Sequence, residues 1–344
     1  MKALIKSSFE PGVTLMEVEK PVPSKNEALI KVKYSSICGT DLHIYKSDAW
    51  ARSRIKPPLI TGHEMGGTVV EIGSRVSLVK VGDKVAVETH IVDWSCAECR
   101  QGKPHLCSST RILGIDCNGS FAEFVTIPET NLIVNSPLVP DEFLPLEEPL
   151  GNSVHAATIT QVSGKNVLVV GCGPLGLLLL SVLKCYGASR VIVSELNDYR
   201  IDLAKKLGAD LVIKPYELNL VNAVKEATRG EGVDVSFDMS GHPLGISDAL
   251  KALKPGGHMI FFGLPTSDIP LNIADDVIFK GITLHGVIGR QMFATWYEVL
   301  NLIENKKIDL FPIITHRFPL SEIDKAMEVM SQGKSGKIIL NPEL

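Results

Sequence analysis

Long apolar runs are missing from this chain of 344 residues, and their absence argues against a membrane-spanning protein. The longest apolar stretch, Leu175–Leu183, is far shorter than the roughly 18 residues that a membrane helix needs. The chain begins with Met1-Lys2-Ala3, which is typical of a strand and lacks the apolar segment and the cleavage site of a signal peptide. We therefore expect a cytoplasmic protein that does not bind membranes.

Runs of like charge are also missing. The formal net charge is only -4, and the charged residues, 22% of the chain, are mixed in sign along the sequence. This pattern excludes the extended basic surface of a nucleic-acid-binding protein and favours a small-molecule partner. Hydrophobic residues make up 45% of the chain, enough to form cores, and the length favours two domains. The sequence contains no internal repeat and no low-complexity segment.

The seven cysteines are an odd number, which weakens the case for a disulfide framework. Three of them lie close together at the spacing of metal ligands. Reduced thiols and zinc explain this pattern better than disulfides do.

Residues 1–150 contain short apolar runs separated by turn residues, for example Ala28–Val32, Gly67–Ile72 and Lys84–Val87. This pattern predicts a strand-rich, largely antiparallel domain.

From Lys165 onward, strand and helix patterns alternate, which predicts an α/β domain with a parallel sheet covered by helices. Helices are expected up to Tyr186 and Leu207. Six strands are expected, at Asn166–Val170, Arg190–Ser194, Leu211–Ile213, Val233–Asp238, His258–Phe262 and Thr283–Gly286.

After Gly289 the sequence predicts a helix around Trp296–Ile303 and a last strand at Lys337–Leu340. The parallel sheet has no evident place for that strand, so we expect it to return to the first domain. The predicted division is 1–150 for the first domain, 151–289 for the nucleotide-binding domain and 290–344 for the return.

A glycine-rich motif follows the first strand of the α/β domain. The run is Gly171-Cys172-Gly173-Pro174-Leu175-Gly176, a G-x-G-x-x-G pattern at a strand-to-helix turn. Its glycines permit a tight turn and a close approach of pyrophosphate to the backbone, while the helix N-terminus attracts negative charge. The motif predicts a dinucleotide site, and an ordinary strand-to-helix turn is the alternative.

An acidic residue, Glu195, ends the second strand 19 positions after Gly176. An acid at this place accepts hydrogen bonds from the adenosine ribose and repels the extra phosphate of NADP, so we expect NAD. For Arg200 two interpretations stay open: it lies over the adenine, or it occupies the exposed face of its helix.

Cys96, Cys99 and Cys107 form a C-x2-C-x7-C cluster, and three thiolates suit a closed tetrahedral zinc site. Asp93 stands where a further cysteine would complete the series, and its carboxylate is the candidate fourth ligand of a structural zinc. The alternative is a weakened or empty site with three ordinary loop cysteines.

A second possible metal site is spread along the chain. It combines Cys38, the adjacent pair His63 and Glu64, and Glu148. One thiolate, one imidazole and carboxylates suit a catalytic zinc that keeps a position open for water or substrate. Cys38 or His63 alone would more often be a core residue, but their occurrence together upstream of a dinucleotide fold favours metal binding.

At these residues the chain resembles the zinc-containing medium-chain alcohol dehydrogenases. The resemblance rests on Gly62-His63-Glu64 followed by Gly66 and Gly67, and on Val81–Val85, and it covers the whole chain. Within this family the chain is similar to the L-threonine 3-dehydrogenases, through the stretches Cys38–Tyr45, Glu88–Ile91, Gly151–His155, Gly289–Tyr297, Pro312–His316 and Ser335–Lys337.

The resemblance implies a GroES-like catalytic domain, a Rossmann domain inserted before its last segment, and a homotetramer. It implies that Cys38, His63 and Glu64 hold the catalytic zinc, with Glu148 as an additional or exchanging ligand. It further implies that Thr40 and His43 relay the proton and that His90 lines the substrate site. Asp93 departs from the family pattern, which has a cysteine there.

The expected reaction is hydride transfer from a secondary alcohol to NAD, with zinc making the hydroxyl more acidic. The resemblance favours L-threonine, whose product would be 2-amino-3-oxobutanoate. Arg290 is a candidate for binding the substrate carboxylate, or instead the cofactor. The alternatives are a polyol, sugar or sugar-acid dehydrogenase with the same mechanism, a zinc-free quinone-reductase-like protein, and a nucleotide-binding protein without catalysis.

Overall fold

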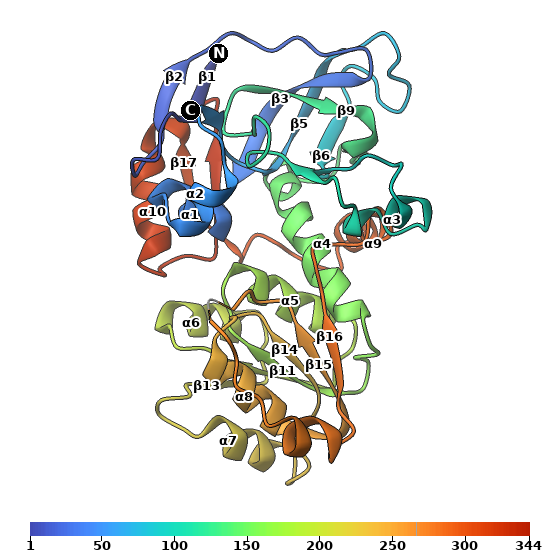
Figure 1. The fold of residues 1–344 in the computed structure, drawn as a ribbon, viewed down its shortest axis with the longest axis vertical. Coiled ribbons are helices and arrows are strands. Elements are labelled where there is room, and N and C mark those ends of the chain that lie inside the picture. The colour runs from blue at the N-terminus through green and yellow to red at the C-terminus, as the bar shows by residue number, and fades with distance from the viewer. Residues whose placement is uncertain (266) are drawn as a thin grey trace. The chain divides into compact units, whose positions relative to one another are not determined.

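The computed structural model describes residues 1–265 and 267–344, which form two compact units (Figure 1). The first unit comprises residues 1–149, 291–306 and 314–344, and the second comprises 150–290 and 307–313. The chain passes from the first to the second inside helix α4 (Leu144–Thr158), after Pro149. The domain boundaries drawn from the sequence stay a prediction. Among the described residues, no helix is both long and apolar enough to cross a membrane.

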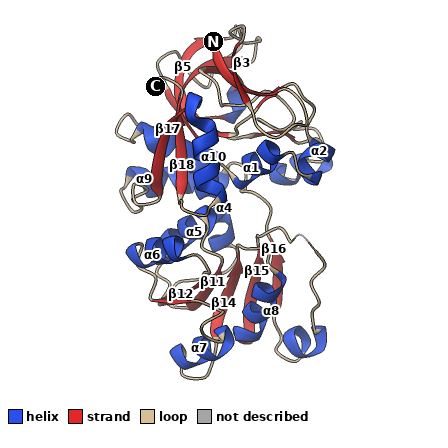
Figure 2. Cartoon of the chain, turned by 90° about the vertical axis from the view of Figure 1, so that its left-hand side faces the viewer, coloured by secondary structure: helices blue, strands red, loops and turns tan. Residues whose placement is uncertain are grey.

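The first unit is rich in strands, with helices at its margins (Figures 1 and 2). Its strands are β1 (Lys2–Lys6), β2 (Thr14–Glu17), β3 (Glu27–Ser36), β4 (Leu59–Ile60), β5 (Glu64–Ile72), β6 (Lys84–Val87), β7 (His90–Ile91), β8 (Arg111–Ile112), β9 (Phe124–Pro128), β10 (Leu132–Val134), β17 (Ile314–Pro319) and β18 (Lys337–Asn341). Its other helices are α1 (Gly39–Lys46), α2 (Ala49–Arg54), α3 (Ala97–Arg100), α9 (Ala294–Glu304) and α10 (Ile323–Ser331). Short 3₁₀ turns occupy Pro104–Leu106, Glu129–Asn131, Asp141–Phe143 and Leu320–Glu322.

The largest sheet of this unit has the order β10-β6-β5-β3-β18-β17, and β9 also pairs with β3. Its pairs are antiparallel except β17 with β18, which agrees with the largely antiparallel domain that the sequence predicted. Alternate residues of β3, namely Ala28, Ile30 and Val32, are buried in one core, as a period of two requires. β18, the last strand of the chain, pairs with β3 in this sheet.

The second unit is a six-stranded parallel sheet with the order β13-β12-β11-β14-β15-β16, as predicted. The strands are β11 (Asn166–Val170), β12 (Arg190–Ser194), β13 (Leu211–Ile213), β14 (Val233–Asp238), β15 (Leu253–Phe261) and β16 (Thr283–Gly286). The helices are α5 (Pro174–Cys185), α6 (Asp198–Lys206), α7 (Leu220–Ala227), α8 (Pro243–Ala252) and a π-helical turn at Ile273–Ile278.

The central strand β11 is apolar and buried from Val167 onward, as expected for a strand with both faces of the sheet covered. Leu168 lies in one core with Val224 of α7 and Leu250 of α8. Val167 and Val169 point to the opposite face by the alternation of a strand, and they are fully buried. The chain leaves β11 at its carboxyl end, where the glycine-rich motif begins.

Candidate functional site

Cys38, His63 and Glu64 come together in the first unit, as the sequence predicted. Cys38 precedes the first turn of α1, and Glu64 opens β5 immediately after His63. One ligand atom from each residue lies within 4.8 Å of the other two. Zinc bonds of about 2.0–2.3 Å place neighbouring ligand atoms roughly 3.5 Å apart, so this cluster needs little adjustment to hold the ion.

The surroundings of His63 favour positive charge. Burial alone lowers the pKa of His63, but the Asp41 and Cys38 side chains outweigh it and raise the pKa well above its ordinary value. Asp41 Oδ1 lies 3.6 Å from His63 Nδ1, too far for a hydrogen bond, and both atoms are buried without a hydrogen-bond partner. A field that favours a protonated imidazole also favours a metal cation, so the residues present fit zinc.

Three further residues, which the sequence did not indicate, support these ligands. Asp41 Oδ2 accepts a hydrogen bond of 2.9 Å from the backbone N–H of Cys38. Ser36 Oγ and Lys337 Nζ both donate to Glu64 Oε2, and the Lys337 ammonium also donates to the carbonyl oxygen of Ile37 at 3.1 Å. Lys337 begins a short strand, and nothing in its local sequence indicates that its side chain faces a carboxylate. Only the fold reveals its contact with Glu64.

Lys337 is a fully buried cation among acidic groups. Burial disfavours its charged form, but the Glu64 carboxylate outweighs burial, with smaller contributions from Cys38 and Glu148, and raises its pKa. Lys337 therefore stays charged and offsets the negative charge of the ligand cluster. Glu148, on α4, interacts electrostatically with Glu64 and Lys337 but lies outside the group of three ligand atoms.

The residue before Glu148 is also a buried acid. Glu147 is completely buried, and its Oε2 accepts a hydrogen bond of 3.2 Å from Asn135 Nδ2, while Oε1 has no hydrogen-bond partner. Burial raises the pKa of Glu147 to about 8, so the carboxyl group is largely protonated at neutral pH.

The predicted relay residues both lie on α1. Thr40 Oγ1 is 3.9 Å from Cys38 Sγ, and His43 follows one turn later on the same helix. The His43 side chain is 58% exposed, and its Nδ1 lies 2.5 Å from Asp48 Oδ2. Thr40 is therefore next to the ligand cluster, and His43 is at the solvent.

His90, the predicted substrate residue, is held by a buried carboxylate. Glu88 Oε1 accepts hydrogen bonds from the backbone N–H of His90 at 2.7 Å and lies 3.2 Å from His90 Nδ1. The other oxygen, Oε2, accepts a hydrogen bond of 2.8 Å from the indole N–H of Trp296, which is fully buried on α9. The segments 88–90 and 294–304 therefore jointly orient the His90 imidazole.

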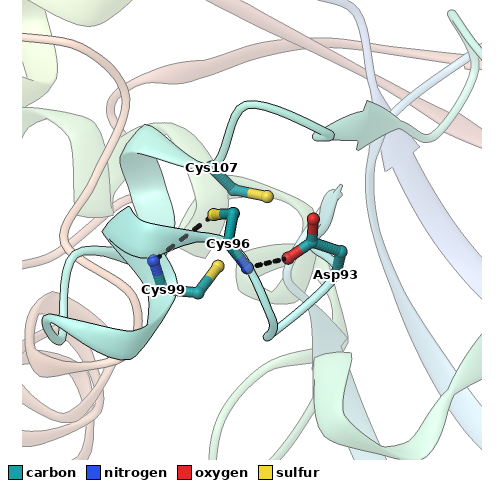
Figure 3. Close-up of side chains that lie close together, drawn as sticks. All are labelled: Asp93, Cys96, Cys99 and Cys107. Atoms are coloured by element: carbon teal, nitrogen blue, oxygen red, sulfur yellow. Dashed lines mark hydrogen bonds between the residues drawn. The ribbon is translucent and has the colours of Figure 1, made fainter.

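The second cluster also assembles around its three cysteines. One ligand atom each from Asp93, Cys96, Cys99 and Cys107 lies within 4.8 Å of the others, and Figure 3 shows the three sulfur atoms and the carboxylate facing a common centre. Asp93 Oδ1 accepts hydrogen bonds from the backbone N–H groups of Ser95 and Cys96, which lower its pKa to about 2. An ionised carboxylate with a second oxygen to offer fits as the fourth ligand of zinc.

The glycine-rich motif forms the turn between β11 and α5. Gly171 has a φ of +86°, which other residues rarely adopt, and a Cβ on Gly176 would lie 2.2 Å from the carbonyl oxygen of Gly171. A Cβ on Gly173 would meet no atom closer than Arg200 at 3.9 Å, so the approach to this backbone is open. Pro174 and Leu175 begin α5, whose N-terminus adds positive potential for a phosphate.

Glu195 follows β12 and faces the glycine-rich motif. Its Oε2 accepts a hydrogen bond of 2.7 Å from the backbone N–H of Cys172, and its Oε1 accepts from the N–H groups of Leu196 and Asn197. A carboxylate has about four acceptor sites, so it can also accept ribose hydroxyls. Arg200 is half-buried near Gly173, and its Nε is buried without a hydrogen-bond partner.

Arg290 is buried rather than exposed, with 1% of its surface accessible. Its Nη1 donates a hydrogen bond of 3.3 Å to Asn152 Oδ1, and its aliphatic part lies against Gly151. The nearby His155 Nδ1 lies 3.0 Å from the carbonyl oxygen of Gly289. The structure thus joins the segments 151–155 and 289–290, two of the stretches that carry the resemblance.

The comparison with known families agrees with this architecture. Residues 24–139 match the alcohol dehydrogenase GroES-like domain, and residues 174–305 match the zinc-binding dehydrogenase family. The chain belongs to the zinc-dependent medium-chain alcohol dehydrogenases and is an oxidoreductase of that family.

The chain is similar over its whole length to an L-threonine 3-dehydrogenase from Caldanaerobacter subterraneus, with 47% identity over 99% of each chain. Other relatives of that name are 44–46% identical over 98–100% of this chain. Among solved structures, the 2R,3R-butanediol dehydrogenase of Bacillus subtilis is 27% identical, with a TM-score of 0.91 and 99% of each chain covered. A short chain alcohol dehydrogenase of Escherichia coli complexed with NADH has the same identity, TM-score and coverage.

Proposed function

We propose that this protein is a zinc- and NAD-dependent L-threonine 3-dehydrogenase, which oxidises the 3-hydroxyl of L-threonine to give 2-amino-3-oxobutanoate. The observation that carries the proposal is the buried cluster of Cys38, His63 and Glu64 in a chain 44–47% identical to relatives of that name. The two parts are independent, because the cluster indicates the chemistry and the relatives indicate the substrate.

Cys38, His63 and Glu64 would hold the catalytic metal, and Glu148 would be an additional or exchanging ligand. Bound zinc supplies Lewis acidity that makes an alcohol hydroxyl easier to deprotonate, and bound NAD accepts the hydride. Asp41 and Lys337 keep the ligand set oriented and electrostatically balanced. The chemistry of the ligand set supports an open metal position for the substrate.

In this proposal, the Thr40 hydroxyl accepts the proton of the substrate hydroxyl as it passes its own proton onward, and His43 at the end of the relay releases one proton to water. The first is beside the Cys38 thiol and the second is exposed, so the helix α1 connects the ligand cluster to solvent. His90 contacts the substrate, with its ring fixed by Glu88. Arg290 is assigned to the substrate carboxylate or to the cofactor.

The nucleotide site is proposed to prefer NAD over NADP. Gly173 leaves the backbone open for pyrophosphate, and the Glu195 carboxylate, bonded to the N–H of Cys172 in the same turn, would repel the extra phosphate of NADP. Arg200, over Gly173, is assigned to the adenosine part of the cofactor.

A second, structural zinc is proposed at Asp93, Cys96, Cys99 and Cys107. The ionised Asp93 carboxylate and the three converging sulfur atoms support this assignment. The metal would stabilise the loop that contains α3, because a bound structural zinc contributes directly to folding.

We also propose that the enzyme acts in the cytoplasm as a homotetramer. Within the described residues, β16 ends the six-stranded sheet and pairs on one side only, with β15. Leu284 on that strand is 39% exposed, as is expected of an edge that meets another copy of the chain.

The substrate is tested by incubating the purified protein with NAD and L-threonine, sorbitol, 2,3-butanediol, inositol or a sugar acid, while NADH absorbance is recorded. We expect L-threonine to give the highest kcat/KM by at least tenfold. A polyol or a sugar acid in first place would contradict the substrate and leave the hydride-transfer chemistry standing.

Cys38→Ser tests the metal assignment, and Cys117→Ser is the matched control, because Cys117 is a partly exposed cysteine outside both clusters. We expect the first variant to lose bound zinc and activity and the second to keep both. Equal activity in the two variants would contradict the catalytic metal site.

A further inference from the structure

His43 has a carboxylate partner that is also a helix cap. Asp48 is the N-cap residue of α2, and its Oδ1 accepts a hydrogen bond of 2.9 Å from the backbone N–H of Ala51. The other oxygen, Oδ2, lies 2.5 Å from His43 Nδ1. The Trp50 ring packs against the same imidazole in an edge-to-face arrangement, with ring centroids 6.2 Å apart and an interplanar angle of 65°. Asp48 is thus fixed by α2 and oriented toward the ring of His43.

The position of His43 on α1 explains what this partner could do. Cys38 caps α1, Thr40 lies in its first turn, and His43 follows three residues after Thr40 on the same face of the helix. The imidazole has two nitrogen atoms, and the neutral ring carries one proton. A carboxylate at Nδ1 holds that proton there and leaves the lone pair at Nε2.

We propose that Asp48 is a positioning residue for His43, which selects the tautomer with the proton on Nδ1 and stabilises the imidazolium formed during proton release. The inference rests on the proposed function, in which His43 is the last member of the relay. The ring accepts one proton at Nε2 while Nδ1–H remains bonded to Asp48. One proton then leaves to water, and the Asp48 carboxylate stays ionised throughout.

The charges around this pair agree with that role. The pKa of Asp48 lies below its ordinary value, mainly because the backbone N–H of Ala51 donates to its carboxylate and to a smaller extent because His43 lies beside it. The carboxylate is therefore ionised. Other charged residues on neighbouring segments have different partners: Arg54 bonds to Asp116, Arg52 bonds to backbone carbonyl oxygens, and Asp324 bonds to the Tyr45 hydroxyl.

Two substitutions separate this role from helix capping. Asp48→Asn keeps an oxygen for the N–H of Ala51 but presents an amide N–H to His43 Nδ1, which disfavours the required tautomer and the imidazolium. Asp48→Ser keeps the cap with a side chain too short to reach the ring. Asp324→Asn is the control, because it removes a carboxylate that bonds to another side chain of α1.

The experiment measures kcat with L-threonine as a function of pH for the zinc-loaded wild type and each variant. We expect the acidic limb of the profile to differ from the wild type in Asp48→Asn and Asp48→Ser, because the His43 ring loses its anionic partner. The plateau should fall by up to about tenfold in Asp48→Asn, within the contribution of a general base. Asp324→Asn should match the wild type.

His43→Gln separates failure of this inference from failure of the relay. We expect His43→Gln to change the profile and the double variant His43→Gln with Asp48→Asn to match it, because Asp48 acts through the ring. If His43→Gln changes the profile and both Asp48 variants match the wild type, the role of Asp48 is refuted and the relay stands. If His43→Gln also matches the wild type, the relay and the inference are both refuted.

Discussion

Glu147→Gln should make the protein more resistant to alkaline pH. Glu147 is completely buried, and its pKa is raised by burial from an ordinary value of 4.5 to about 8. The folded state therefore keeps a proton that the unfolded chain has already lost. The stabilisation that protonated Glu147 contributes to the folded state is fully present below the pKa of this group in the unfolded chain, about 4.5. It is lost as the pH rises from there to about 8, the pKa in the folded protein.

The difference between these two pKa values corresponds to roughly 5 kcal/mol of unfolding free energy, of which roughly 3 kcal/mol is lost between about pH 6 and pH 9. Glutamine has the shape of the protonated acid but does not ionise, so this loss should disappear in the variant. The assay is urea unfolding of the zinc-loaded protein at both pH values, at one protein concentration.

Glu322→Gln is a suitable control, because Glu322 is a partly exposed acid that bonds to Lys325 at the surface. We expect the control to lose as much stability between the two pH values as the wild type does. The reasoning is refuted if Glu147→Gln and the wild type lose equal free energy of unfolding over this range.

Three other substitutions test single contacts. Trp296→Phe removes the hydrogen-bond donor to the buried Glu88 carboxylate. The free energy of unfolding should therefore fall by about 2 kcal/mol, and KM for L-threonine should rise. Unchanged values in urea unfolding and in kinetics would contradict this. Glu195→Ala should lower kcat/KM with NAD and raise it with NADP, and an unchanged ratio would remove Glu195 from cofactor selection. Asp93→Cys should slow zinc release to a chelator, because a fourth thiolate replaces the carboxylate, and an unchanged rate of release would argue against a metal at this cluster.

The sequence predicted the parallel sheet well because its signals are local. Strands β11, β12 and β14 begin and end where the predicted runs do, since each run is mostly apolar, bounded by turn residues and largely buried. The first domain was predicted only as a class, because short strands such as β4 and β7, with two residues each, have no pattern of their own.

The ligand residues could be predicted because each stands in a short motif, but their supports could not. Lys337 bonds to Glu64 across 273 positions of sequence, and Trp296 bonds to Glu88 across 208. No local pattern indicates such pairs, because the strand β18 and the helix α9 bring them together only when the chain folds. Asp48 was missed for a different reason, since an N-cap residue has a sufficient local explanation.

The central claim is that the cluster of Cys38, His63 and Glu64 holds a zinc ion used to oxidise L-threonine. The most direct measurement is the ratio of kcat/KM for L-threonine to that for 2R,3R-butanediol, with NAD, before chelation, after chelation and after zinc is restored. We predict a ratio far above one, loss of activity with the metal and its return with zinc. A ratio below one, or activity that survives complete removal of the metal, would contradict the account.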